Sequence, residues 1–201
     1  MSRQNRVAPD GRIFADPGRG LFLGNRGCIH DDQGRIIRSH RNRAWITCLL
    51  SFKERRRALM QPGRWTELFF LDEAVALSAG HRPCAECRRA DYNAFRAAWV
   101  AAGLPGVKAV EMDAVLHASR LTGSGVQQRF TATVRQLPDG ACVEDSGQAC
   151  LLRHGMVHPY AASGYRPGRP CPPGEISVLT PAPIVAVLRA GYWPVLHPSV
   201  G

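Results

Sequence analysis

The sequence predicts an α+β fold with a small α/β module first, a helical bridge next, and a β-rich antiparallel module at the end. Three observations support this order: short apolar runs between turns before residue 72, apolar residues at helical spacing up to residue 121, and alternating patterns after residue 128. The 201 residues suit one large domain or two small ones. We expect an N-terminal domain over residues 1–104 and a C-terminal domain over residues 105–201.

The N-terminal part is expected to begin with a β-hairpin over Gly20–His40, whose turn is the sequence Asp-Asp-Gln-Gly at residues 31–34. The apolar run Arg43–Phe52 predicts the next strand. After the turn Gln-Pro-Gly at residues 61–63, Trp65–Leu71 predicts another strand. These strands form the sheet of the first module.

Three helices are expected to follow. Asp72 is placed to cap a short helix over Glu73–Ala79, and the glycine at position 80 ends it. A longer helix begins near Cys87, because aromatic residues recur at three- and four-residue spacing at positions 92, 95 and 99. The third helix is expected over about Val107–Leu121.

The remaining residues predict short strands separated by turns and one long loop up to residue 174. A final helix begins after Thr180, with proline at its first position. The expected strands are Arg129–Arg135, Ala141–Glu144, Ala149–Leu152 and Ile176–Leu179.

Charge is concentrated in the first third of the chain. Of a net charge of +10, residues 1–66 supply a surplus of nine, with 14 basic and 5 acidic residues. Arginine outnumbers lysine strongly, and its planar guanidinium suits phosphate groups, so a nucleic-acid partner is expected. No apolar run reaches the roughly 20 residues needed to cross a bilayer, and no secretory signal is visible. We therefore expect a cytoplasmic protein without a membrane partner.

The most specific motif is Cys84-Ala85-Glu86-Cys87, preceded by proline and followed by two arginines. This Cys-x-x-Cys spacing at a helix start is typical of half a zinc site, with two more ligands elsewhere. A thioredoxin-like redox pair would require a preceding strand, and a helix is expected there instead. A zinc deaminase would require His-x-Glu or Cys-x-Glu upstream, which the candidate histidines and cysteines lack.

Residues Leu68–Arg88 (LFFLDEAVALSAGHRPCAECR) resemble the second half of the Ada-type zinc-binding domain. The resemblance extends over about residues 43–92 and is specific over Phe69–Cys87. It implies a small α/β domain in which four cysteines hold zinc. In that family one cysteine of the earlier pair accepts a methyl group from a DNA phosphotriester, after which the domain binds DNA more tightly.

The first half of the resemblance is incomplete. The family has Cys-x3-Cys followed by basic residues, whereas here Cys48 is followed four residues later by Phe52. Cys28, or His30 as its substitute, is the candidate for the missing ligand. The expected zinc ligands are therefore Cys28, Cys48, Cys84 and Cys87.

These observations predict a zinc-binding, DNA-binding protein that acts in the recognition or repair of damaged DNA. If the zinc centre accepts alkyl groups, Cys48 is the nucleophile. The residues expected to contact DNA are basic and lie beside the zinc motif: Arg55, Arg56, Arg57, Arg82, Arg88 and Arg89.

Two other functions stay open at the level of the sequence. One is a nuclease in which zinc is structural, a histidine such as His30 or His40 activates water, and Asp31 or Asp32 binds a divalent ion. The other is a non-enzymatic module that binds RNA or another protein through its basic third.

Overall fold

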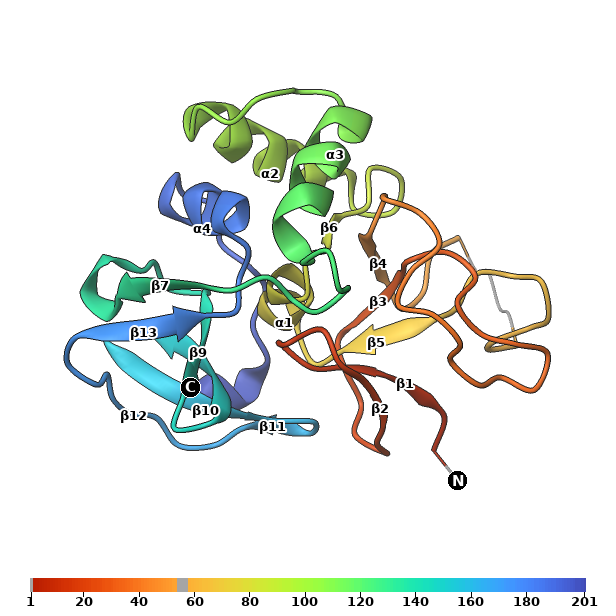
Figure 1. Ribbon diagram of the computed structural model, residues 1–201, viewed down its shortest axis with the longest axis horizontal. Coiled ribbons are helices and arrows are strands. Elements are labelled where there is room, and N and C mark those ends of the chain that lie inside the picture. Colours follow the sequence, from red (N-terminus) through yellow and green to blue (C-terminus); the bar gives the residue numbers. More distant parts are fainter. Residues whose placement is uncertain (1, 54–57) are drawn as a thin grey trace.

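The computed structural model describes residues 2–53 and 58–201, and within them it confirms an α+β fold built on two sheets (Figure 1). The first sheet is mixed, since β1 pairs with β5 and β4 with β6 in parallel while its other pairs are antiparallel. Its strand order is β2-β1-β5-β3-β4-β6. Its strands are β1 (Gln4–Val7), β2 (Ile13–Ala15), β3 (Phe22–Asn25), β4 (Ile46–Leu49), β5 (Leu68–Phe70) and β6 (Arg82–Pro83).

The second sheet contains only antiparallel pairs, as the alternating sequence after residue 128 predicts. The order along its main path is β11-β10-β9-β8-β13-β7, and β12 pairs with β10. Its strands are β7 (Phe130–Thr133), β8 (Cys142–Asp145), β9 (Gln148–Arg153), β10 (Met156–Ala161), β11 (Gly164–Tyr165), β12 (Arg169–Pro170) and β13 (Glu175–Val178).

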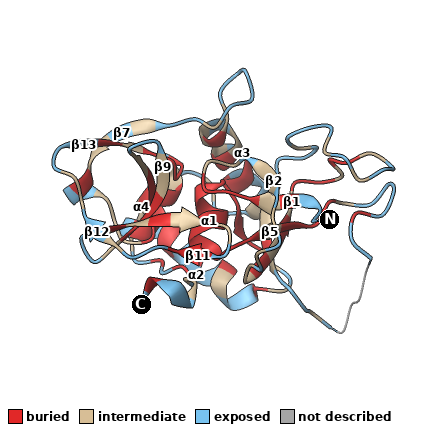
Figure 2. Ribbon diagram, turned by 90° about the horizontal axis from the view of Figure 1, so that it is seen from below, coloured by how far each residue is buried: buried red, intermediate tan, exposed pale blue. Residues whose placement is uncertain are grey.

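Helix α1 lies between the two sheets and is buried along its whole length (Figure 2). The predicted cap is confirmed, since Oδ1 of Asp72 accepts a hydrogen bond from the backbone N–H of Val75 at 2.9 Å. None of the helices among the described residues is both long and apolar enough to span a membrane. The helices are α1 (Glu73–Ser78), α2 (Arg89–Ala101), α3 (Ala109–Arg120) and α4 (Ala182–Arg189), with single 3-10 turns η1 (Val134–Gln136) and η2 (Pro198–Val200).

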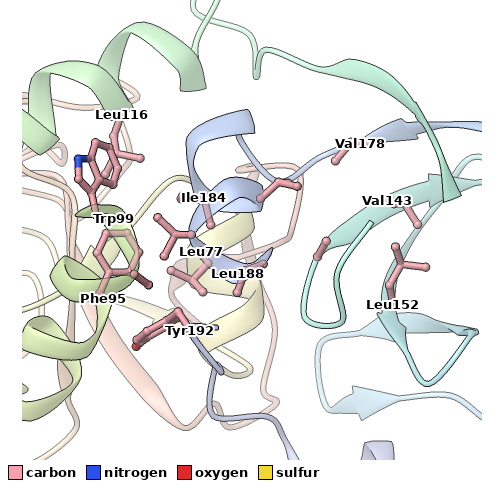
Figure 3. Packing of buried hydrophobic residues seen from close by; sticks show 14 of the residues in the cluster. Leu77, Phe95, Trp99, Leu116, Val143, Leu152, Val178, Ile184, Leu188 and Tyr192 are labelled. Carbon is pink, nitrogen blue, oxygen red and sulfur yellow. The ribbon is translucent and has the colours of Figure 1, made fainter. Parts of the chain in front are cut away.

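The larger hydrophobic core joins residues from both halves of the chain. Leu77 of α1, with Phe95 and Trp99 of α2, belongs to the same buried cluster as Val143 and Leu152 of the second sheet (Figure 3). A second cluster connects the first sheet to β8 and β9 through α1. Both cores therefore contain side chains from either side of residue 104.

Two strand predictions differ from the structure. The N-terminal hairpin is β1–β2, with Asp10 and Gly11 in its turn, whereas the segment 20–40 contributes only β3 and an isolated bridge between His30 and Ile36. Strand β3 pairs with β4 and β5 instead of with residues 35–38. The predicted loop before residue 174 contains β10, which pairs with β9 over four residues of each strand.

Candidate metal centre

Two short parallel strands bring the cysteines of the zinc motif to Cys48. Strand β4 carries Cys48, and strand β6 ends one residue before Cys84. The strands pair in register with Thr47 opposite Pro83, and the N–H of Cys84 donates to the carbonyl of Thr47 at 2.9 Å. The thiols of Cys48 and Cys84 therefore meet at the same edge of the first sheet.

The sulfur atoms of Cys48, Cys84 and Cys87 all lie within 4.8 Å of one another, close enough to hold one metal ion. Cys84 is buried, whereas the other two side chains are partly exposed. Thiolate is a soft ligand that selects zinc, copper(I) or iron–sulfur clusters over hard cations. Three sulfurs bound to zinc at about 2.3 Å lie roughly 4 Å apart, so the cluster needs little rearrangement to bind an ion.

The surroundings of the cluster favour a thiolate at Cys84. A hydrogen bond from the Cys48 thiol lowers the pKa of Cys84 to about 5, and the backbone N–H groups of Cys87 and Glu86 act in the same direction. The N–H of Glu86 lies 3.4 Å from this sulfur. The same bond to Cys84, together with burial, raises the pKa of Cys48. A bound cation would supply the positive charge that all three sulfurs need to ionise.

A cavity of about 350 Å³ opens beside the cluster. The three cysteines line it together with apolar and aromatic side chains, among them Leu23 and Trp65, and with two carboxylate residues, Glu67 and Glu86. Structural zinc sites have four protein ligands, whereas sites that bind an exchangeable ligand have three and an open position. The described residues thus supply three thiols next to an open space.

Cys28 and His30 lie apart from this cluster. The Cys28 thiol points to the carbonyl of His30 at 3.8 Å and does not belong to the group of three sulfurs. The ring of His30 contacts Thr66 Oγ1 at 2.6 Å through Nδ1 and the carbonyl of Gln61 at 3.2 Å through Nε2. The structure therefore brings together three of the four predicted ligands, and the fourth predicted ligand has another environment.

Asp31 has a structural role in its turn. Its Oδ1 accepts the backbone N–H groups of Gln33 and Arg35, and its Oδ2 lies 2.7 Å from Nε of Arg35. The backbone hydrogen bond from Arg35 lowers the pKa of this carboxyl. With both ring nitrogens of His30 also engaged, these two residues do not form an open pair that could activate water.

Two of the predicted DNA-contacting arginines are buried in ion pairs. Arg82 forms two hydrogen bonds to Asp113, and Arg88 lies 2.9 Å from Glu73 and 2.8 Å from Asp91. Their guanidinium groups are therefore not available at the surface. Arg89 is exposed, and Arg55, Arg56 and Arg57 fall outside the described residues.

Three further arginines, close together in the chain, are exposed and were not among the predicted DNA contacts. Arg38, Arg41 and Arg43 are all exposed on the connection between β3 and β4, which leads directly to the strand of Cys48. The close spacing of these three arginines in the sequence could have predicted a basic segment. Glu67, which lines the cavity beside the thiols, had no signal because only the folded chain brings it there.

A comparison of the chain with protein-family models, with curated proteins and with solved structures found no match.

Proposed function

We propose that the protein binds one zinc ion through Cys48, Cys84 and Cys87 and binds DNA through exposed arginines on the connection between β3 and β4. The observation that carries the proposal is the convergence of three thiols within 4.8 Å from two separate parts of the chain. Tetrahedral zinc–thiolate sites commonly combine a Cys-x-x-Cys pair with ligands from a distant part of the chain. The resemblance of Leu68–Arg88 to the Ada-type domain supports the same metal.

The fourth coordination position is proposed to take an exchangeable ligand from the adjoining cavity. Cys28, the protein thiol expected there, donates instead to a carbonyl of its own loop. The cavity is wide enough for water or a small substrate and has largely apolar walls. An ion with three protein ligands in such a space differs from a closed structural site.

The proposed DNA contact relies on charge and position. Most of the net charge of +10 comes from residues 1–66, and three exposed arginines, Arg38, Arg41 and Arg43, precede the strand that carries Cys48. Exposed arginines on a surface segment neutralise phosphates and release counterions. We infer that this connection follows the DNA backbone.

Metal stoichiometry tests the zinc assignment. Purified wild-type protein should contain one zinc per chain by elemental mass spectrometry, and Cys48→Ser should lose most of it. Cys28→Ser is the matched control, because it removes one partly exposed thiol outside the cluster and should retain the metal. Equal zinc content in Cys48→Ser and the wild type would refute the three-cysteine centre.

The proposed DNA binding is tested by measuring the affinity for duplex and for single-stranded DNA at increasing salt concentration. Affinity should fall as salt rises, and Arg38→Gln/Arg41→Gln should lower both affinity and the slope of log K against log salt. Arg135→Gln/Arg166→Gln removes the same charge from exposed positions on the C-terminal half. Equal losses in both double variants would show that only net charge matters, and absence of binding at low salt would remove the DNA proposal.

Alkyl acceptance by Cys48 is a second candidate, favoured by one observation: this sulfur is only partly buried and lines the cavity, where a substrate can approach. A zinc-bound thiolate would attack the methyl carbon of a phosphotriester, so that an S–CH3 bond forms, the CH3–O bond breaks and the phosphodiester anion leaves. Mass spectrometry after incubation with methylated DNA should then find a methyl group on Cys48. Modification of Cys28 alone, or of no cysteine, would exclude this reaction.

A further inference from the structure

A second unusual feature lies at the other end of strands β4 and β6, around Trp45. Two arginines from distant parts of the chain pack on its indole ring, with guanidinium carbons 4.0 Å (Arg26) and 4.5 Å (Arg120) from the ring centroid. Both arginines are almost completely buried, with 3% and 1% of their surface exposed. They form a buried pair of like charges.

Neither guanidinium has an acidic partner among residues 2–53 and 58–201. Arg26 donates to Nε2 of His81 at 3.3 Å and to the carbonyl of Gly11 at 3.4 Å. Arg120 donates to the carbonyls of Leu116 at 3.0 Å and of Arg43 at 3.2 Å. Within this described part of the chain, Nη2 of each arginine has no hydrogen-bond partner.

This arrangement is unfavourable without a counter-charge. Burial lowers the pKa of Arg26 and of Arg120 to about 9. The charge of Arg120 adds to the effect on Arg26, whereas the charge of Asp113 partly offsets the effect of burial on the pKa of Arg120. Each cation–π contact stabilises the folded state by about 0.5–2 kcal/mol, whereas burying an ion destabilises it by several kcal/mol. Arg82 and Arg88, by contrast, are buried with carboxylates.

Both arginines line one cavity of about 220 Å³. Among the described residues that line it, one is acidic: Asp10, whose Oδ2 already lies 3.7 Å from Nε of Arg12, another lining residue. A single water occupies about 30 Å³ in the liquid, so the space is large enough for a phosphate group. The cavity is open enough to the surface that the exposed Ser39 is part of its wall.

Gln127 adds a requirement for a hydrogen-bond donor. Its Nε2 donates to the carbonyls of Pro9, Ser78 and Leu179 at 2.9–3.1 Å, which fixes the orientation of the amide. Its Oε1 is buried, lacks a partner within the described residues, and belongs to a side chain that lines the cavity. A ligand that carries both acceptor oxygens and a hydroxyl satisfies the arginines and this oxygen together.

We propose that the cavity formed by Arg26, Arg120 and Gln127 binds a phosphate dianion, either as hydrogen phosphate or as the phosphate of a small monoester. Two guanidinium groups neutralise its two charges with charge-assisted hydrogen bonds. The hydroxyl of hydrogen phosphate, or of the esterified sugar or polyol, donates to Gln127. This site is separate from the cysteine centre and does not depend on the zinc assignment.

Isothermal titration of the purified, metal-loaded protein with sodium phosphate at constant ionic strength tests the proposal. We expect one site per chain with a submillimolar dissociation constant. Arg26→Met and Arg120→Met, which keep the packing on Trp45, should each weaken binding at least tenfold. Arg135→Met removes an exposed arginine elsewhere and should leave affinity unchanged.

Ser39→Asp provides a second variant that leaves both arginines in place. Its carboxylate at the cavity wall should repel phosphate and weaken binding, while thermal unfolding shows that the chain is folded. Glycerol 3-phosphate, titrated in parallel, distinguishes the sources: tighter binding than inorganic phosphate assigns a monoester, and weaker binding assigns free phosphate. Absence of phosphate binding, the same affinity in all arginine variants, or affinity for sulfate equal to that for phosphate would overturn the proposal.

Discussion

Arg82 and Asp113 form a bidentate ion pair in the interior, with Nε to Oδ1 and Nη2 to Oδ2 both at 2.8 Å. Their side chains are only 5% and 6% exposed. Arg82 lies two residues before the first cysteine of the motif, and Asp113 lies on α3. The pair therefore fixes the cysteine turn against a helix that follows it in the chain.

We expect Asp113→Ala to lower the free energy of unfolding by about 3–5 kcal/mol, because it leaves a buried guanidinium without its counter-ion. The matched control is Glu144→Ala, which breaks the 2.8 Å pair with Arg129 at the surface, where both side chains are about a third exposed. That change should cost less than about 1 kcal/mol. Urea denaturation of both variants measures the difference, and equal losses would contradict it.

Stability should decrease as the pH falls below neutrality, in part because of His81. Complete burial, together with the charges of Arg26 and Arg120, lowers the pKa of His81 well below 6.5. The unfolded chain therefore takes up a proton as pH falls through 6.5 while the folded chain does not, and acid favours unfolding.

His81→Gln keeps an acceptor for Arg26 and removes this titration. Its unfolding free energy should fall less between pH 7.5 and 5.5 than that of the wild type. Other groups that titrate in this range, such as Asp72, whose pKa burial raises to about 6, are present in both proteins and cancel in the comparison. Identical pH dependence in urea denaturation would show that His81 has no such effect.

Metal removal should destabilise the protein only when the three-cysteine centre is intact. A ligand that binds only the folded state, present at 100 times its dissociation constant, raises the free energy of unfolding by about 2.7 kcal/mol. Chelation should therefore lower the unfolding temperature of the wild type and of Cys28→Ser, and leave that of Cys48→Ser unchanged. Calorimetry with and without chelator measures these shifts; a shift in Cys48→Ser equal to that of the wild type would be the contrary result.

A fragment of residues 1–104 should not unfold cooperatively by itself. Without the second sheet and α4, it would expose Leu77, Phe95 and Trp99, which are completely buried in the full chain. We expect a broad thermal transition and poorly dispersed amide resonances, with the full-length chain as the reference. A sharp transition for the fragment would establish the N-terminal module as an independent domain.

Local sequence signals predicted the local structure well. The Asp72 cap and the helix after it depend on neighbouring residues, and so does the turn that places Cys84 and Cys87 together. The third thiol, Cys48, was expected from the resemblance to the Ada-type domain, whereas the apolar run around it indicated only a strand. The pairing of β1 with β5 and of β4 with β6 depends on contacts far apart in the chain and has no local pattern.

Charged residues were the hardest to place. Arg82 and Arg88 look like surface cations beside a helix start, but their partners, Asp113 and Glu73, are 31 and 15 positions away. A sequence shows how many charges there are and not which of them are neutralised in the interior. For the same reason nothing in the sequence distinguished Arg26 from the exposed arginines before and after it, Arg19 and Arg35.

Strands β4 and β6, four and two residues long, have consequences beyond holding the sheet together. Their carboxyl ends carry the thiols. Trp45 and His81 immediately precede the two strands; Trp45 lines the cavity of Arg26 and Arg120, and His81 accepts a hydrogen bond from Arg26. Occupation of either end restrains the same few peptide bonds. If zinc increases the affinity for phosphate by some factor, linkage requires phosphate to increase the affinity for zinc equally. The occupancy of each site would then depend on the concentrations of both ions.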